Sequence, residues 1–503
     1  ITADATDIAG NISDMSAALQ IVIDLTPPSA PLDPASLGGL DMIDASDTGA
    51  SNSDNYTSDQ TPTFSGTAEK GSSVEIVSDV DGIVGGGIAD AATGKYLITA
   101  SSLSSGIHLI TAAATDTAGN TSPASGGLNI TIDNSIPGQP SLPELLLSSD
   151  NGVPDDDITN DSTPSIAGNA VADSYVDIYT NNVNTATVAV DGTGAYNYTY
   201  DVLADGTYSI RVVCNNKAGN SSVSSDVLSI TIDTQLPDLS TVNIVSDNVK
   251  PVWARVSNTV SLSLTSSERI QEPNVSIDGK TVAITGGPTF WIATRTMDGT
   301  ESQDTLNFTI QYDDIAGNTG ITKTETTDLS HVVFDNTNPD ILDISIESDH
   351  TNPDKARIGS EINIYFTSSE VIEGTSVKVN GKSAIVNLVS GNDWLATSYM
   401  ASNDPIGAIS FSIDYSDLAG NSGVQKTSVT DGSYVLFDKT MPAYDTVFIY
   451  SNNVNPEFAV DGDQVTLEFE TTEEIEIPSV FINGIAPDLI SGGPTYWKAV
   501  RTI

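Results

Sequence analysis

The chain has 503 residues, of which 67 are acidic and 18 basic, for a formal net charge of −49. Such a field repels nucleic acid and anionic lipid and attracts cations, so we expect no nucleic-acid partner. No stretch approaches the roughly 18 apolar residues of a membrane-spanning helix, and we expect no membrane insertion of this segment.

The tripeptide Ala-Gly-Asn recurs five times, with successive spacings of 109, 100, 98 and 103 residues. Each copy is followed by a short alternating apolar segment that ends in Asp, and a Pro stands four residues later. These aspartates are Asp24, Asp133, Asp233, Asp335 and Asp438. A period near one hundred residues suits whole domains rather than solenoid repeats.

The Asp-to-Pro steps mark the joints of this predicted array. We expect 1–24 to hold the C-terminal strands of a preceding domain. The following segments, called the first to fifth below, are 25–133, 134–233, 234–335, 336–438 and the N-terminal part of a domain in 439–503. Because Ile1 and Ile503 both fall inside a repeat, we expect an array truncated at both ends, an excerpt of a longer polypeptide.

Between the joints the sequence predicts short strands, for example at 108–113, 128–132, 207–213 and 227–232. Helical periodicity is not sustained anywhere, and turn residues recur every eight to twelve positions. This pattern predicts an all-β fold, a linear tandem array of immunoglobulin-like β-sandwich domains.

Two subtypes share the common ending. The first and second segments open a strand with Thr-Pro, at Thr61 and Thr163. The later segments instead carry two-residue hairpin turns, whose positions both need positive φ. These turns are Asp278-Gly279, Asn380-Gly381 and Asn483-Gly484.

A tryptophan stands at one fixed place in each segment of the second subtype: Trp291, Trp394 and Trp497. These rings are interpreted as core anchors, with a glycan-stacking platform as the alternative. The only cysteine, Cys214, is expected to be a buried strand residue, and no intrachain disulfide can form.

Catalysis is not expected. The three histidines, His108, His331 and His350, lie in different repeats, and no phosphate-binding glycine loop is present. Glutamates recur at equivalent positions, Glu268, Glu370 and Glu473, but one carboxylate per domain is half of the pair that glycoside hydrolysis needs. We interpret them as residues that form salt bridges or protect a strand edge.

Three sequence motifs point to a known family. They are Asp116-Thr117-Ala118-Gly119-Asn120, Thr61-Pro62-Thr63-Phe64-Ser65-Gly66-Thr67-Ala68 and the Ile-Thr-Ile-Asp ending before a Pro linker. The chain resembles tandem bacterial immunoglobulin-like (Big-type) repeats of giant secreted or surface adhesins, including the stalks of RTX adhesins. The resemblance implies seven-stranded sandwiches, often stiffened by calcium at the junctions.

In such a sandwich the turn between the last two strands lies at the entry end, and the final strand leaves at the other end. Each joint Asp should therefore approach the Asp-x-Ala-Gly-Asn turn of the next domain. The expected sets are Asp24 with Asp116 and Asn120; Asp133 with Asn216 and Asn220; Asp233 with Asp314 and Asn318; Asp335 with Asp417 and Asn421; and Asp438 beside the last joint.

Oxygen ligands without His or Cys suit a hard cation, and we expect Ca²⁺ at these joints. Asn216 replaces the usual Asp, so its joint should bind most weakly. A second acidic group in the first subtype, Asp47 and Asp54 with the matching Asp150, Asp155 and Asp157, resembles a calcium loop without EF-hand spacing. The alternative for all these acids is turn formation without metal.

The sequence thus predicts a non-catalytic extracellular spacer of a bacterial surface adhesin, a calcium-stiffened rod for cell adhesion or biofilm formation, partnered by calcium ions and by neighbouring domains of the same chain. Two alternatives remain open. One is a filament in which copies of the chain assemble head to tail by strand complementation. The other is an array of glycan-binding modules that use the repeated tryptophans.

Overall fold

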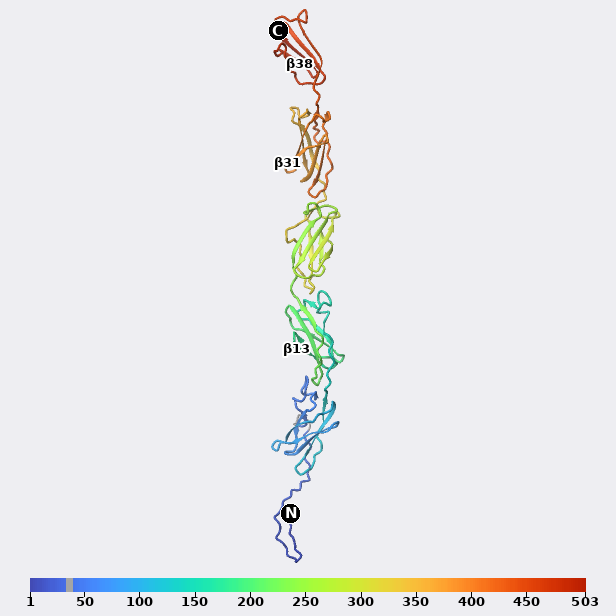
Figure 1. The fold of residues 1–503 in the computed structure, drawn as a ribbon, viewed down its shortest axis with the longest axis vertical. Helices are drawn as coiled ribbons and strands as arrows, with labels where there is room; N and C mark the ends of the chain where they lie inside the picture. The colour runs from blue at the N-terminus through green and yellow to red at the C-terminus, as the bar shows by residue number, and fades with distance from the viewer. Residues whose placement is uncertain (33–38) are drawn as a thin grey trace. The chain divides into compact units, whose positions relative to one another are not determined.

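The computed structural model describes residues 1–32 and 39–503. Within these ranges the chain forms strands and loops without any helix (Figure 1), and accordingly none that is long and apolar enough to cross a membrane. The predicted all-β class is therefore confirmed.

The chain folds into two compact units. The first comprises Ile1–Val242, Ser263–Ala293 and Phe308–Asp328, and the second comprises Asn243–Leu262, Thr294–Asn307 and Leu329–Ile503.

The first and second segments, both in the first unit, repeat one topology. Their strands are β1 (Asp41–Met42), β2 (Tyr56–Thr57), β3 (Thr63–Thr67), β4 (Ser73–Ser78), β5 (Gly82–Ile88), β6 (Lys95–Thr99), β7 (Gly106–Thr115) and β8 (Leu128–Ile132), then β9 (Glu144–Leu145), β10 (Ile158–Thr159), β11 (Ser165–Asn169), β12 (Tyr175–Thr180), β13 (Val183–Ala189), β14 (Ala195–Thr199), β15 (Gly206–Asn215) and β16 (Leu228–Ile232). The first segment has a five-stranded sheet, β2-β8-β7-β4-β5, and a three-stranded sheet, β1-β3-β6. The second segment has the matching five-stranded sheet β10-β16-β15-β12-β13 and three-stranded sheet β14-β11-β9.

Alternation of apolar and polar residues builds the cores of these two segments. In β12 every second residue is buried, so Val176 and Ile178 face inward while Asp177 stays half-buried. Cys214 is fully buried in β15, with its Sγ 3.1 Å from Ser174 Oγ, as the sequence predicted.

The antiparallel pair β7 and β8 positions the joint residues of the first segment. Gly106, at the start of β7, pairs with Ile132 at the end of β8. Asp116 follows the far end of β7, and Asp133 follows β8 directly. The turn and the joint Asp therefore leave the sheet at opposite ends, as a chain of successive joints requires.

The later segments contain strands β17 (Leu239–Ser246), β18 (Trp253–Ala254), β19 (Thr259–Ser266), β20 (Asn274–Ile277), β21 (Lys280–Thr281), β22 (Ala283–Gly286), β23 (Phe290–Thr296), β24 (Phe308–Gln311) and β25 (Val333–Phe334); β26 (Ile341–Ser348), β27 (Lys355–Ala356), β28 (Glu361–Ser368), β29 (Ile372–Val379), β30 (Lys382–Ser383), β31 (Ile385–Ser390), β32 (Asp393–Tyr399), β33 (Gly407–Ala408), β34 (Phe411–Asp417) and β35 (Leu436–Phe437); and β36 (Tyr444–Ser451), β37 (Gln464–Thr471), β38 (Leu489–Gly492) and β39 (Tyr496–Thr502).

In the second unit the fourth segment forms three sheets, β26-β28-β32-β31, β27-β35-β33 and β30-β29-β34, and the fifth forms β36-β37-β39-β38. Strand β35 ends immediately before Asp438, and β25 ends immediately before Asp335. The joint aspartates of the second subtype thus also stand at strand ends.

The three predicted hairpin turns have positive φ at both central residues. The values are 49° and 69° at Asp278-Gly279, 46° and 78° at Asn380-Gly381, and 54° and 75° at Asn483-Gly484. Strand pairs close directly beside them, for example Val379 with Lys382. The turn chemistry therefore fixes these hairpins as predicted.

The repeated tryptophans pack into the cores. Trp291 is 9% exposed and Trp497 is 7% exposed. The half-buried Trp394 ring stacks on Phe366, with ring centroids 6.2 Å apart and an interplanar angle of 6°. The buried Trp291 and Trp497 rings cannot offer the open face that sugar stacking needs, so the glycan-platform interpretation is wrong for these two rings.

Candidate metal centres

The Asp-x-Ala-Gly-Asn turn is held by its own first and last side chains. Asp314 is fully buried, and its two carboxylate oxygens accept bonds from the backbone N and the Nδ2 of Asn318, each at 2.8 Å. Gly317 between them has φ +93°, a conformation that favours glycine. Asp417 and Asn421 repeat both bonds at 2.8 Å.

The same asparagine ties each turn to the preceding joint. Asn318 Nδ2 donates to the main-chain oxygen of Asp233 at 2.8 Å. Equivalent bonds join Asn120 to Asp24 at 3.1 Å, Asn220 to Asp133 at 2.7 Å and Asn421 to Asp335 at 2.9 Å. The structure thus brings each joint Asp against the turn with which the sequence paired it.

At two joints a glutamate completes a group of three carboxylates. Asp233, Glu268 and Asp314, here the first triad, each place one ligand oxygen within 4.8 Å of the others. Asp335, Glu370 and Asp417, the second triad, do the same. Among residues 1–32 and 39–503, these are the two groups of three potential metal ligands that lie this close.

Glu268 and Glu370 are site residues that the sequence analysis missed. They were interpreted as salt-bridging or edge-protecting, but they lie among acids instead, and no lysine or arginine pairs with them in the described part of the chain. That interpretation is wrong. The one available signal was their recurrence at equivalent positions after a Ser-Ser pair.

The triads are electrostatically strained without a counter-ion. Burial raises the pKa of Glu268 above the ordinary value of 4.5, and the charges of Asp233 and Asp314 raise it further. Burial, Asp335 and Asp417 raise the pKa of Glu370 in the same way. A divalent cation among three carboxylates would reverse this repulsion, and oxygen donors alone suit a hard ion such as Ca²⁺.

The joints at Asp24 and Asp133 are built differently. At the second of these, Asn216 Nδ2 donates to Asp133 Oδ2 at 2.9 Å and to the Ser135 main-chain oxygen at 3.1 Å. An amide therefore occupies the place where a cation would neutralise the Asp133 carboxylate. Asp24 is exposed, and Asp116 is half-buried, with no third carboxylate that completes a triad among the described residues.

Asp438 lies beside the third of the repeated glutamates. Burial and the charge of Asp438 raise the pKa of Glu473. This pair reproduces the Asp and Glu of a triad.

The acidic loops of the first subtype contain one buried Asp each. Asp47 and Asp150 are 5% and 8% exposed, whereas Asp54 and Asp155 are exposed and Asp157 is half-buried. In each loop the buried aspartate interacts electrostatically with other acids of the same loop, Asp47 with Asp54 and Asp150 with Asp155 and Asp157.

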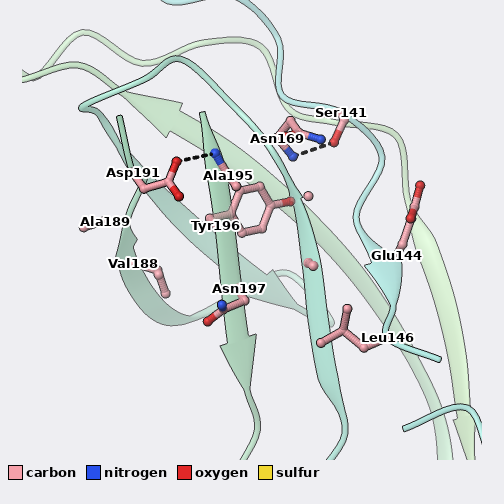
Figure 2. Close-up of a pocket in the computed structure, with 12 residues that line it drawn as sticks. Ser141, Glu144, Leu146, Asn169, Val188, Ala189, Asp191, Ala195, Tyr196 and Asn197 are labelled. Carbon is pink, nitrogen blue, oxygen red and sulfur yellow. Dashed lines mark hydrogen bonds between the residues drawn. The ribbon is translucent and has the colours of Figure 1, made fainter. Parts of the chain in front are cut away.

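The surface groove of Figure 2 has a volume of about 530 Å³ and lies in the second segment. Tyr196 crosses it, and its buried hydroxyl lies over Gly168, where an added Cβ would be 2.4 Å from the Oη. Tyr96 covers Gly66 in the first segment in the same way. This repetition indicates that the ring fills the sheet surface beside a glycine, which is a packing role.

The histidines also have local structural partners. The buried His108 ring places Nδ1 2.9 Å from Ser78 Oγ and Nε2 2.7 Å from the Ser104 main-chain oxygen. The His331 and His350 rings each place Nδ1 within hydrogen-bond distance of nearby backbone atoms, those of Leu329 and Asn352. The three rings belong to separate segments.

A family model described as the bacterial Ig-like domain matches residues 35–134 and 136–234. No curated protein matches the chain. Three solved structures illustrate more distant likenesses. The chain is 19% identical to a Ca²⁺-stabilised adhesin that helps an Antarctic bacterium bind ice, over 79% of this chain and 98% of that one, with a TM-score of 0.34.

A 1.5-MDa bacterial ice-binding adhesin is 16% identical over 59% of this chain and 97% of its own, with a TM-score of 0.27. The I9–I11 tandem of titin is 10% identical over 60% of this chain and 96% of its own, with a TM-score of 0.21. Such distant likenesses carry no argument about function. The family match, together with the repeated two-sheet topology of the two segments, shows that the chain contains bacterial Ig-like domains in two tandem copies.

Proposed function

We propose that the chain is a non-catalytic spacer region of a bacterial surface adhesin, in which Ca²⁺ bound at the triads fixes the orientation of successive domains. The single observation that carries this proposal is the assembly of three carboxylates from separate parts of the chain at two successive joints. The proposed domains are the first to fourth segments, flanked by segments 1–24 and 439–503.

The chemistry of the triads supports calcium. Their ligands are carboxylates, with no imidazole or thiolate in either group. Calcium accepts six to eight such ligands in flexible geometry and is abundant outside the cell. The proposed location is therefore extracellular, on the bacterial surface or secreted.

The energetic consequence is a clamp that acts only when calcium is present. Without a cation, the buried Asp314 and Asp417 face two further acids each, which favours separation of the joint. At a calcium concentration one hundred times the dissociation constant, binding would stabilise each site by about 2.7 kcal/mol.

Small-angle X-ray scattering of the whole chain tests this proposal. The wild type in Ca²⁺ should show a larger maximum dimension and a higher melting temperature than in chelator. The double variant E268Q/E370Q should respond much less to Ca²⁺. The control E272Q/E325Q, which removes the same charge from two exposed glutamates, should respond like the wild type.

An equal response of E268Q/E370Q and wild type would contradict the clamp. So would a wild type whose dimension and melting temperature do not change with Ca²⁺.

A further inference from the structure

The acidic loops of the first two segments contain a buried carboxylate oxygen that nothing satisfies. Acidic loop 1 is residues 47–59, and acidic loop 2 is residues 150–161. Asp47 Oδ2 accepts the Asn55 N–H at 3.1 Å, and Asp150 Oδ2 accepts the Asp155 N–H at 2.6 Å. The Oδ1 atom of each aspartate is buried without a hydrogen-bond partner.

A buried, unpaired carboxylate oxygen is costly, and natural structures rarely leave one without a ligand. The equivalent Oδ1 atom lacks a partner in both copies of the loop, so the unpaired oxygen is a repeated property of this loop and not an irregularity of one segment. It lies among other acids. Asp155 and Asp156 act electrostatically on Asp150, and Asp150 acts in turn on the half-buried Asp157.

Side-chain cations of the protein do not neutralise the loop aspartates. No lysine or arginine forms an ion pair with the aspartates of either loop in the part of the chain that the structure describes. Near loop 1, the Lys217 ammonium lies 5.7 Å from the centre of the Tyr56 ring. Loop 2 has more carboxylates, with three consecutive aspartates from Asp155 to Asp157, and is the stronger of the two candidate sites.

Both loops dock on the next Ala-Gly-Asn turn. In loop 1, Thr48 Oγ1 donates to the Ala218 main-chain oxygen at 2.6 Å. In loop 2, Val153 N donates to Ile315 O at 3.0 Å and Asn160 N to Ala316 O at 3.1 Å. A Cβ on Gly152 would lie 2.2 Å from Ile315 O, so the loop backbone is in direct contact with the turn.

The corresponding contact in the second unit is made with a protein cation. There Asn248 Nδ2 donates to Ala419 O at 2.8 Å, and Arg255 Nη1 donates to Gly420 O at 2.7 Å. The Lys250 ammonium forms an ion pair with Glu373 beside it. Positive charge is therefore built into this contact, whereas no lysine or arginine forms an ion pair with the aspartates of the acidic loops in the described part of the chain.

We propose that acidic loop 2, and more weakly acidic loop 1, binds a divalent cation of calcium's type through its buried aspartate, and that this ion holds the loop in the conformation that docks on the next turn. The site shares no residue with either triad. Asp150 and Asp157 supply side-chain oxygens in loop 2, and Asp47 and Asp54 supply them in loop 1.

Equilibrium dialysis of the whole chain against Ca²⁺ alone tests this site. The variant D150N/D157N should bind one ion fewer than the wild type. The control D201N/D226N removes two exposed carboxylates from the same segment and should keep the full number. The variant D47N/D54N should lose an ion that the wild type binds only at higher Ca²⁺ concentration.

A melting experiment separates a binding role from a structural one. In chelator, D150N/D157N should melt at or above the wild-type temperature, because the amide removes an unpaired buried charge. In Ca²⁺ it should melt below the wild type. An unchanged ion number in D150N/D157N would overturn the proposal, and so would an equal drop of melting temperature with and without Ca²⁺.

The triad variant E268Q/E370Q makes the two proposals distinguishable. If it binds as many ions as the wild type while D150N/D157N loses one, the triads fail and the loop site stands. The opposite pattern would reject the loop site and leave the triads.

Discussion

The side-chain amide of Asn318 donates to the main-chain oxygen of Asp233, a residue 85 positions earlier in the chain, at 2.8 Å. The same amide holds the Asp314 carboxylate at 2.8 Å. One asparagine thus anchors the joint and orients a triad ligand at once, so the joint has a metal-independent part beside the proposed metal-dependent part.

Replacing Asn318 with Ala should destabilise the joint both in Ca²⁺ and in chelator. The substitution leaves a carboxylate oxygen of the fully buried Asp314 without its donor, which costs about 1–3 kcal/mol. Urea unfolding monitored by far-UV circular dichroism, which reports on every segment, measures this loss. The control N120A removes the equivalent amide at a half-buried Asp116, and its loss should be smaller; an equal loss would contradict the role of burial.

The triad glutamates should make stability depend on pH in the absence of metal. Their pKa values are raised above 4.5 in the folded protein, so the native state holds protons that the unfolded chain releases. This stabilisation is complete below pH 4.5 and is lost as pH rises through the raised pKa values.

In chelator, the unfolding free energy of the wild type relative to E268Q/E370Q should therefore fall from pH 4.5 towards neutral pH. In Ca²⁺ the same difference should rise with pH, because only deprotonated carboxylates bind the ion. Chemical denaturation at a series of pH values checks both slopes. If the unfolding free energies of wild type and variant changed in parallel with pH in chelator, the neighbouring acids would not raise the pKa values of the glutamates, which would contradict the prediction.

The Asn216 joint offers the reverse experiment. N216D replaces an amide that donates to Asp133 Oδ2 with a second carboxylate. In chelator this change should cost about 1–3 kcal/mol, because a hydrogen bond becomes a repulsion. Calcium should restore much of the loss and should stabilise the wild-type joint less than the new one. A loss in N216D that Ca²⁺ does not change would contradict this account.

Much of the site followed from simple chemistry in the sequence. Strand alternation, the two-residue turns and the Asp-to-Pro steps are local patterns, and the pairing of each joint Asp with the next turn follows from the ends at which strands such as β7 and β8 leave the sheet. The contribution of Glu268 was different. It depends on the path of the chain after β19, where Ile270 bridges to Asp314, and that long-range contact has no local signature.

The sequence likewise did not predict that carboxylate oxygens of Asp47 and Asp150 would be buried. Composition showed an acidic, turn-forming loop, but burial of one member arises from the packing of the loop as a whole. The docking of Gly152 on the turn at Gly317 is likewise a contact between distant residues.

Substitution of Gly317 isolates this docking contact. G317A and G119A both place an alanine at positive φ, +93° and +97°, so both should lose about 1–2 kcal/mol. Only at Gly317 would the Cβ clash, lying 2.8 Å from Gly152 N, while at Gly119 nothing lies within 4 Å. G317A should therefore lose about 1–3 kcal/mol more in thermal or urea unfolding. Equal losses would mean that loop 2 does not rest on the turn.

A crystal structure of the chain grown in Ca²⁺, with anomalous scattering collected, tests the central claim most directly. We predict an anomalous peak about 2.3–2.6 Å from carboxylate oxygens of Asp233, Glu268 and Asp314, and a second peak among Asp335, Glu370 and Asp417. Triads that hold only water in such crystals, with their acids turned away from one another, would contradict the claim.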